Sequence, residues 1–387
     1  MVDAEYAQRL AQEVDRYRTV SDVHDLPDIF HYWAERYLMP KLHAVGIQSL
    51  DDFYSEPVLD FCRENSSDTI RVASLGSGNG DTEARLAQRV LAAGQQNFEV
   101  TCVEINASMQ ARAFENARGV GAEQRLRFDA RDLNSWTADC RYHVVMASHS
   151  LHHVVELEHL FREVRSSLVD DGYFLVNDMV GRNGHQRWPE ALSLIQLLWR
   201  SAPARYKYNR QLLVLDDEYV NRDYSMEGFE GIRAQDVLPL LLRTFFPDRF
   251  ISFGNLTSVL TDRGYGHNFD PNSDEDRAFI DRVAQLDDLA IDLGVIKPTQ
   301  LIASFRTKPV EPRFFGNRAP DFSVRDPDVE VALDSEWTRL QADLAGVRAE
   351  HARMLSSKSW RYTLPMRALL VASKRAYGRL NRVARRH

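Results

Sequence analysis

Three histidines stand close together at positions 149, 152 and 153, just after an apolar run. Histidine has an ordinary pKa near neutral pH, so it can remove a proton from a substrate hydroxyl under physiological conditions. Asp178 follows the next apolar run and can assist such a base. We predict His149 or His153 as the base, with Asp178, and His152 as a substrate contact; packing and capping remain alternatives for each histidine.

The same histidines raise the alternative of a metal site, because imidazole is a common ligand of transition metals. Such a site also needs acidic ligands, and Asp178 is the one suitable carboxylate that this part of the sequence offers. We therefore expect no catalytic metal.

A glycine-rich run from Ala73 to Asp81, reading ASLGSGNGD, follows a β-branched segment and precedes an amphipathic one. Glycines at a turn between a strand and a helix let the backbone approach a ligand closely. Glu104 ends the next apolar run, where a carboxylate can bind both hydroxyls of a ribose. The pattern predicts a nucleoside-binding turn.

A nicotinamide cofactor is the first alternative for this turn. Its GxGxxG pattern requires glycine at position 81, where this chain has Asp81. A negative charge at the start of the helix opposes the binding of a pyrophosphate there. A cofactor without phosphates and with a cationic sulfonium fits the GxGxG spacing better.

These motifs resemble those of class I S-adenosylmethionine-dependent methyltransferases, and the resemblance covers residues 68–308. It implies S-adenosyl-L-methionine as cofactor, with the glycines around its methionine part, Glu104 on the ribose and Asp132 on the adenine amine. One departure is Ser74, since the family often has an acidic residue there. The expected cofactor-binding residues are Gly76, Ser77, Gly78, Gly80, Glu104, Asp132, Leu133 and His149.

Apolar patterns predict the elements that position these residues: an α/β fold with a Rossmann-like methyltransferase sheet and helices on both faces. Two insertions interrupt it, at about 181–230 and 264–297. Both carry polar residues near glycines, which suit carbohydrate hydroxyls. The expected strands are 70–75, 98–105, 126–128, 143–147, 173–176, 250–253 and 301–306, and the expected substrate contacts are His152, Arg182, His185, Glu227, Arg233 and His267.

The domain plan places an N-terminal helical extension at 1–67 and the methyltransferase domain at 68–308. Four prolines mark 309–328 as a linker. Apolar residues spaced by four and three predict a short coiled-coil-like helix at 329–356, either docked on the body or pairing two chains. The helical tail at 357–387 has nine Lys and Arg, no acidic residue and an apolar face, which favours a helix lying on an anionic membrane surface over a solvated charged tail.

The tail segment 357–367, SKSWRYTLPMR, resembles a segment near the ends of bacterial surface-polysaccharide glycosyltransferases and glycan methyltransferases. The resemblance implies O-methylation of a sugar hydroxyl on a surface polysaccharide or lipid-linked glycan. Two alternatives remain: a methyltransferase of small molecules or lipids, and a catalytically silent scaffold for glycan-assembly enzymes. Expected partners are the glycan or small-molecule acceptor, a peripheral membrane contact, and glycosyltransferases or a second copy of the chain.

Composition limits these functions further. The chain has 387 residues and a net charge of −8, which repels a phosphate backbone, so we expect no nucleic acid partner. Three widely spaced cysteines predict no disulfide framework, and the first residues lack the basic segment and apolar run that a secretion signal would need, so we expect none. We expect a cytoplasmic enzyme, peripheral at the inner face of the plasma membrane.

Overall fold

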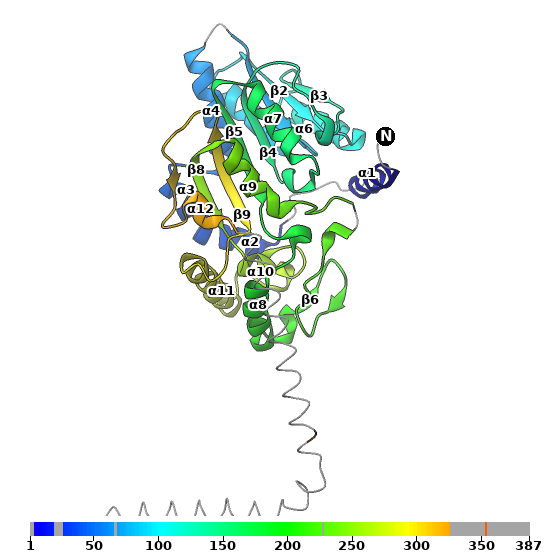
Figure 1. Ribbon diagram of the computed structural model, residues 1–387, viewed down its shortest axis with the longest axis vertical. Helices are drawn as coiled ribbons and strands as arrows, with labels where there is room; N and C mark the ends of the chain where they lie inside the picture. Colours follow the sequence, from blue (N-terminus) through cyan, green and yellow to red (C-terminus); the bar gives the residue numbers. More distant parts are fainter. Residues whose placement is uncertain (1–3, 19–25, 66–67, 227, 326–352, 354–387) are drawn as a thin grey trace, which may run out of the picture. The chain divides into compact units, whose positions relative to one another are not determined.

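The computed structural model describes residues 4–18, 26–65, 68–226, 228–325 and 353. In this part of the chain, the central feature is an eight-stranded sheet in the order β10-β8-β9-β5-β4-β1-β2-β3 (Figure 1). Neighbouring strands from β1 to β5 pair in parallel, whereas β9 runs antiparallel to both β5 and β8. The strands are β1 (Ile70–Leu75), β2 (Phe98–Val103), β3 (Leu126–Asp129), β4 (Tyr142–Ser148), β5 (Leu168–Met179), β8 (Phe246–Phe253), β9 (Gln300–Arg306) and β10 (Arg313–Phe314).

The chain builds this sheet outward in two directions from β1. Strands β2 and β3 follow on one side of β1, and β4 and β5 lie on the other. In open parallel sheets, ligands bind outside the carboxyl ends of the strands at such a reversal of strand order. The Rossmann-like α/β fold predicted from the sequence is confirmed, and the site is expected at the ends of β1 and β4.

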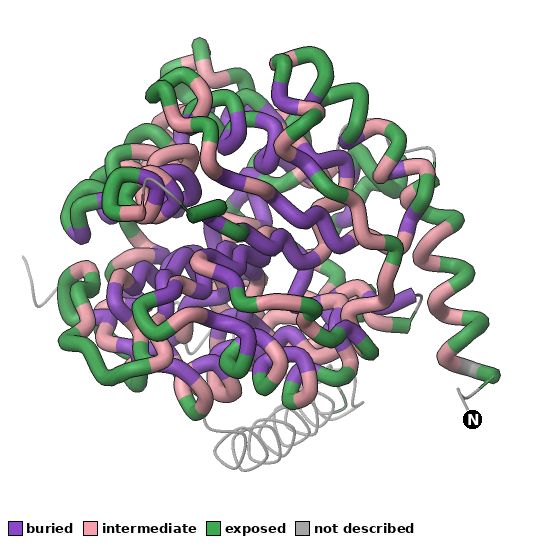
Figure 2. The backbone as a smooth tube through the Cα atoms, turned by 90° about the horizontal axis from the view of Figure 1, so that it is seen from above, coloured by how far each residue is buried: buried purple, intermediate pink, exposed green. Residues whose placement is uncertain are grey.

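Helices cover both faces of the sheet. Apolar residues of α4 (Leu50–Glu64), α5 (Asp81–Ala92) and α6 (Ala107–Gly119) join one buried cluster. Those of α7 (Leu157–Ser167) and α9 (Ala234–Thr244) join a second cluster. Figure 2 shows the buried strands, in purple, between helices whose outer sides are exposed.

The residues of β1 show why this strand lies in the middle. Ile70 and Val72 belong to the first cluster, whereas Ala73 and Leu75 belong to the second. A strand buried on both faces has a nearly continuous apolar sequence, and Arg71 is its single exposed residue. The predicted strand at 70–75 is confirmed.

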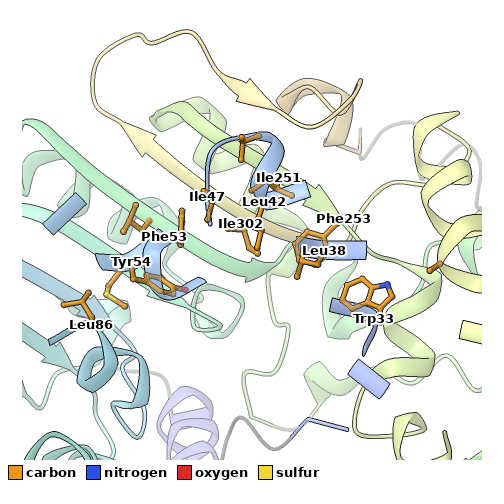
Figure 3. Close-up of a cluster of buried hydrophobic side chains, with 14 of the residues drawn as sticks. Trp33, Leu38, Leu42, Ile47, Phe53, Tyr54, Leu86, Ile251, Phe253 and Ile302 are labelled. Atoms are coloured by element: carbon orange, nitrogen blue, oxygen red, sulfur yellow. The ribbon is translucent and has the colours of Figure 1, made fainter. Parts of the chain in front are cut away.

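Helices also form the described part of the N-terminal segment. Trp33, Leu38 and Leu42 pack against Ile251 and Phe253 of β8, so this segment extends the core over one end of the sheet (Figure 3). No described side chain of the first helix is buried, and Figure 2 shows that helix without purple. The elements are α1 (Ala4–Tyr17), α2 (Asp28–Trp33), the π-helical η1 (Ala34–Leu38) and α3 (Met39–Ala44), before α4.

The two insertions have different structures. Residues 181–230 contain one longer helix, several short 3-10 turns and a two-stranded ribbon, β6 paired with β7. Residues 264–297 consist mainly of one helix. The elements are η4 (Asn183–His185), α8 (Pro189–Ser201), η5 (Ala204–Tyr206), β6 (Tyr208–Asn209), β7 (Val214–Leu215) and η6 (Tyr224–Met226), then η7 (Gly266–Asn268) and α11 (Asp274–Asp292), with α10 (Leu256–Thr261) between them.

The segment predicted as a linker, 309–328, is instead packed on the body as far as Val324. β10 pairs with β8, and the short helix α12 (Pro320–Ser323) follows. Arg318 is 1% exposed and pairs with Asp288 and Asp292 at the end of α11. The prolines indicated an irregular chain, but sequence spacing did not reveal that this arginine is anchored by two carboxylates.

The predicted coiled-coil-like helix at 329–356 and basic tail at 357–387 lie outside the described residues, apart from residue 353. Among the residues that the structure describes, no helix combines the length and the apolar character needed to cross a bilayer.

Candidate functional site

The glycine turn after β1 lies at the expected reversal of strand order. Gly76, Gly78 and Gly80 have φ angles of 70°, 54° and 69°, which side chains other than glycine rarely adopt. A Cβ on Gly76 would approach the Cβ of Ser150 to 2.6 Å, and one on Gly80 would approach the Cβ of Ala113 equally closely. The turn is therefore packed between the loop after β4 and helix α6.

This packing makes Gly80→Ala strongly destabilising. We expect a loss of about 2–5 kcal/mol in the free energy of unfolding, from left-handed backbone strain plus overpacking against Ala113. Gly94→Ala is the matched control, because Gly94 has a φ of 79° but nothing within 4 Å of an added Cβ. Urea unfolding should show a loss of only about 1–2 kcal/mol for the control; equal losses would contradict the packing argument.

Glu104 connects the turn to the end of β2. Its two carboxylate oxygens accept the backbone N–H groups of Gly78, at 3.0 Å, and Asn106, at 2.8 Å. Burial raises the pKa of this carboxyl group. Glu104 therefore lies beside the glycine turn, and its contact with a ribose stays a prediction.

Asp132 and Leu133 follow β3 in the short turn η2 (Leu133–Ser135). The Asp132 side chain accepts the N–H of Asn134 at 2.9 Å, and the Tyr6 hydroxyl of α1 donates to its other oxygen. A Leu133 methyl group lies 3.5 Å from where a Cβ on Gly76 would be. Both residues thus lie along the edge that carries the turn and Glu104.

Helix α1 lies over this edge, which the sequence did not indicate. Asn106 donates to the carbonyl of Val14 at 2.9 Å, and Arg112 donates to the carbonyl of Tyr17 at 3.0 Å. Together with the Tyr6 contact, these bonds hold α1 across the predicted cofactor residues after β2 and β3. The amphipathic pattern of α1 predicts a helix but carries no signal for what it covers.

Two carboxylates and two histidines form a cluster near the carboxyl ends of β4 and β5, in which Asp178 and His152 are buried and Glu230 and His185 are partly buried. His152 lies in the turn η3 (Leu151–His153), and its Nδ1 is 2.5 Å from an oxygen of Asp178. Its Nε2 is 3.5 Å from Glu230, and the Nε2 of His185 is 2.7 Å from the same Glu230 oxygen. Asp178 also accepts the N–H groups of Ser150 and Leu151, so it fixes the whole loop.

Charge coupling sets the protonation of this cluster. Burial opposes the charge on His152, but the carboxylates of Asp178 and Glu230 outweigh it and raise the pKa of His152 to about 10. Burial alone would raise the pKa of Asp178, yet His152 holds it below its ordinary value. Burial lowers the pKa of His185. The cluster therefore carries its positive charge on His152 at neutral pH.

The other two histidines of the loop have different surroundings. His149 has a φ of 53°, and its N–H donates to the carbonyl of Asn177 at 2.7 Å. The Nδ1 of His153 is 2.7 Å from Glu13 of α1, and its Nε2 is 3.8 Å from Glu230. Asp178 is therefore hydrogen-bonded to His152, the histidine that was predicted as a substrate contact.

A metal ion could also use part of this cluster. One ligand atom each from His152, His185 and Glu230 lie within 4.8 Å of one another. Two imidazoles and one carboxylate are a donor set found in zinc sites, and the contact of Asp178 with the other nitrogen of His152 is the usual orienting contact. The expectation of no catalytic metal stays a prediction. Sequence spacing did not indicate that the first insertion brings His185 and Glu230 to His152.

The remaining predicted substrate contacts are scattered. The guanidinium of Arg182 lies 5.3 Å from the centre of the Trp188 ring. Arg233 forms ion pairs with Glu158 and Asp236, each at 2.7 Å, so its guanidinium group has a structural role. His267 is exposed in η7, and Glu227 lies outside the described residues. Of the predicted substrate contacts that the structure describes, His152 and His185 meet in the cluster.

Comparison with known proteins finds one family model and several solved structures that are similar to this chain. Residues 72–172 match the family model described as a methyltransferase domain. Similar solved structures include the O-methyltransferase from a trans-AT PKS multienzyme of Brevibacillus brevis in complex with S-adenosyl-L-homocysteine (15% identity, 66% of this chain and 71% of that chain, TM-score 0.35). Another is the [4+2]-cyclase SpnF (18% identity, 66% of this chain and 81% of that chain, TM-score 0.35). A third is a complex of DhpI with SAH (21% identity, 44% of this chain and 69% of that chain, TM-score 0.27). No curated protein matches the sequence.

The matched segment runs from β1 into β5 and includes the glycine turn and Glu104. The match identifies residues 72–172 as a methyltransferase domain, and this domain lies on the parallel part of the sheet. The protein is an S-adenosylmethionine-dependent methyltransferase, and its cofactor is S-adenosyl-L-methionine.

Proposed function

We propose that the chain O-methylates a sugar hydroxyl of a bacterial surface polysaccharide or lipid-linked glycan. The observation that carries the proposal is the Asp178–His152–Glu230 arrangement at the carboxyl ends of β4 and β5. A hydroxyl is a poor nucleophile until a base takes its proton, and this arrangement is built to hold a proton on an imidazole.

The cofactor would lie along the edge formed by β3, β2, β1 and β4. In this placement Asp132 and Leu133 contact the adenine, and Glu104 binds the ribose. Gly76, Ser77, Gly78 and Gly80 surround the methionine part, which directs the methyl group toward the loop that carries His149. Support comes from the Glu104–Gly78 hydrogen bond and from the close packing of the turn.

His152 is the base in this proposal. When bound, S-adenosylmethionine would supply its methyl group to the acceptor oxygen, and S-adenosylhomocysteine would leave with the electron pair of the broken carbon–sulfur bond. The hydroxyl proton passes to Nε2 of His152, which is neutral in the reactive form. Asp178 orients the ring, and both carboxylates stabilise the imidazolium that results.

A lipid-borne acceptor is supported by the ribbon of the first insertion. Leu212, Leu213, Val214 and Leu215 are consecutive and 46%, 71%, 41% and 55% exposed. Exposed aliphatic residues at the turn of a short ribbon suit insertion into a lipid surface. With the basic tail at 357–387, they favour an enzyme held peripherally at the inner face of the membrane.

The membrane contact predicts a specific loss of binding. Leu213→Asp combined with Leu215→Asp should weaken binding to vesicles of anionic phospholipid by about tenfold or more, because two buried leucines are lost from the lipid. Leu289→Asp is the control, since Leu289 is 55% exposed on α11. Cosedimentation of the full chain with the vesicles measures the effect. Equal binding by the ribbon variant and the Leu289→Asp control would show that the ribbon does not contact the membrane.

A methyl-transfer assay tests the proposed O-methylation directly. The full chain is incubated with methyl-labelled S-adenosylmethionine and lipid-linked glycans from cells that lack its gene. Acid hydrolysis followed by mass spectrometry should show label in an O-methyl sugar. Label that appears only in free metabolites or in phospholipid would instead favour the methyltransferase of small molecules or lipids.

A further inference from the structure

The histidine–carboxylate cluster after β5 places three metal-ligand atoms close together. One ligand atom each from His152, His185 and Glu230 lie within 4.8 Å of one another. The Nε2 atoms of both rings face the same carboxylate oxygen of Glu230, at 3.5 Å for His152 and 2.7 Å for His185. Ligands of a tetrahedral zinc ion, at bond lengths of about 2.0–2.1 Å, lie about 3.3 Å apart. The two distances lie on either side of this separation, so small side-chain shifts are enough to close the site.

Neighbouring groups orient two of these ligands. Asp178 lies 2.5 Å from Nδ1 of His152, so the proton of a neutral ring stays on Nδ1, and Nε2 keeps a free lone pair on the side of Glu230. The Tyr17 hydroxyl donates to the other oxygen of Glu230 at 3.2 Å. Metal-bound histidines and carboxylates usually have such outer contacts. The cluster therefore has the orienting contacts of a metal site as well as the ligands.

Charge balance favours a divalent cation in this cluster. Metal ligation needs neutral imidazoles, which leaves the carboxylates of Asp178 and Glu230 as two negative charges. The ion pairs of both carboxylates are with histidines. The side chains of His152 and Asp178 are 3% and 0% exposed, so water screens these charges poorly. A divalent ion balances both charges, whereas a proton balances only one.

We propose that His152, His185 and Glu230 bind zinc and that the bound ion inhibits the enzyme. Two imidazoles with one carboxylate suit zinc, whereas Mg²⁺ and Ca²⁺ prefer oxygen ligands. The inhibition rests on the proposed function, in which Nε2 of His152 takes the hydroxyl proton. Zinc on Nε2 occupies the lone pair that this step needs, so methyl transfer stops until the ion leaves. The ion has no part in the reaction itself.

Calorimetry tests the site without a measurement of activity. The full chain, freed of metal ions by dialysis against a chelator, is titrated with Zn²⁺. His185→Gln should weaken zinc binding at least about 100-fold, because loss of an outer partner alone costs about 10–100-fold. His153→Gln is the matched control and should bind zinc like wild type. Its ring lies beside that of His152, with centroids 4.2 Å apart, but its Nδ1 faces Glu13.

Cobalt(II) provides a second measurement that needs no variant. It binds in zinc sites, and its visible absorption is intense in a tetrahedral site and weak in the octahedral sites that exposed side chains and water form. The wild-type chain should show the intense absorption, and zinc should abolish it by displacing the cobalt. Weak absorption alone would exclude a tetrahedral site of protein ligands.

Methyl-transfer rates test the inhibition. With free zinc at about ten times its dissociation constant, the wild-type rate should fall about tenfold, and excess chelator should restore it. Each variant is compared with its own rate without zinc, so a change in basal activity does not affect the result. At the same zinc concentration, His185→Gln should keep its rate.

The outcomes separate the zinc site from the proposed function. Zinc binding that His185→Gln leaves unchanged, or that His153→Gln weakens equally, would overturn the site. No zinc binding at all would also overturn it, but O-methylation with His152 as base would stand. Binding at the site without inhibition would show that His152 is not the base, and a rate that rises with zinc would make the ion an activator; either result ends the inhibitory role. A chain that bound zinc in this way but methylated no acceptor would keep the site and lose both the proposed function and the inhibition.

Discussion

His152→Gln is expected to lower kcat about 10²–10⁴-fold, the usual contribution of a general base, while the affinity for S-adenosylhomocysteine stays unchanged. The reason is geometric. Glutamine can keep a hydrogen bond to Asp178, but it cannot take the proton of the acceptor. His152 is 3% exposed, so no solvent base can replace it at that position. Initial rates with labelled cofactor and calorimetry with S-adenosylhomocysteine measure the two quantities.

The pH profile gives the same experiment a second readout. The wild-type kcat/KM should rise with pH toward about 10, since carboxylates on both sides keep His152 protonated below that pKa. The rise should disappear in His152→Gln. His159→Gln is the control, because His159 lies on α7 and its Nε2 is 2.9 Å from the Trp136 carbonyl oxygen. Unchanged kcat in His152→Gln, or loss of wild-type activity after dialysis against a chelator, would count against base catalysis.

Local patterns in the sequence were sufficient to predict β1 and the position of the glycine turn. β1 has the predicted bounds because both of its faces are buried and its apolar run is continuous. The glycine turn and Glu104 lie together because parallel neighbours such as β1 and β2 end at the same edge of the sheet. Spacing along the chain was enough to establish both.

The partners of the histidines were not local and could not be predicted. His149, His152 and His153 share one loop, in which His149 has a left-handed backbone with a φ of 53°. Glu230 reaches His152 from the far end of the first insertion, and Glu13 reaches His153 from α1. No spacing in the sequence relates these segments, so the contacts of Glu230 and Glu13 with the histidines appeared only in three dimensions.

Asp178→Asn should produce the largest loss of stability in the site. We expect the free energy of unfolding to fall by about 3–5 kcal/mol near pH 6, since this change removes one member of a buried ion pair. Asp178 is 0% exposed and accepts from Ser150, Leu151 and Met179 besides contacting His152. An asparagine amide has one acceptor oxygen, so at least one of these donors faces an N–H group instead.

The size of this loss should depend on pH in a defined direction. The pKa of His152 rises from its ordinary 6.5 to about 10 in the folded chain, so its stabilising charge is complete below pH 6.5 and is lost as pH rises through 10. Asp178 has a lowered pKa, so its share is present above its ordinary value of 3.8 and is lost in acid. Urea unfolding of wild type and Asp178→Asn should therefore differ most between about pH 4 and 6.5 and converge toward pH 10. Asp171→Asn, exposed on the same strand, should stay near wild type throughout, and a pH-independent gap for Asp178→Asn would show that lost hydrogen bonds, rather than the ion pair, set its stability.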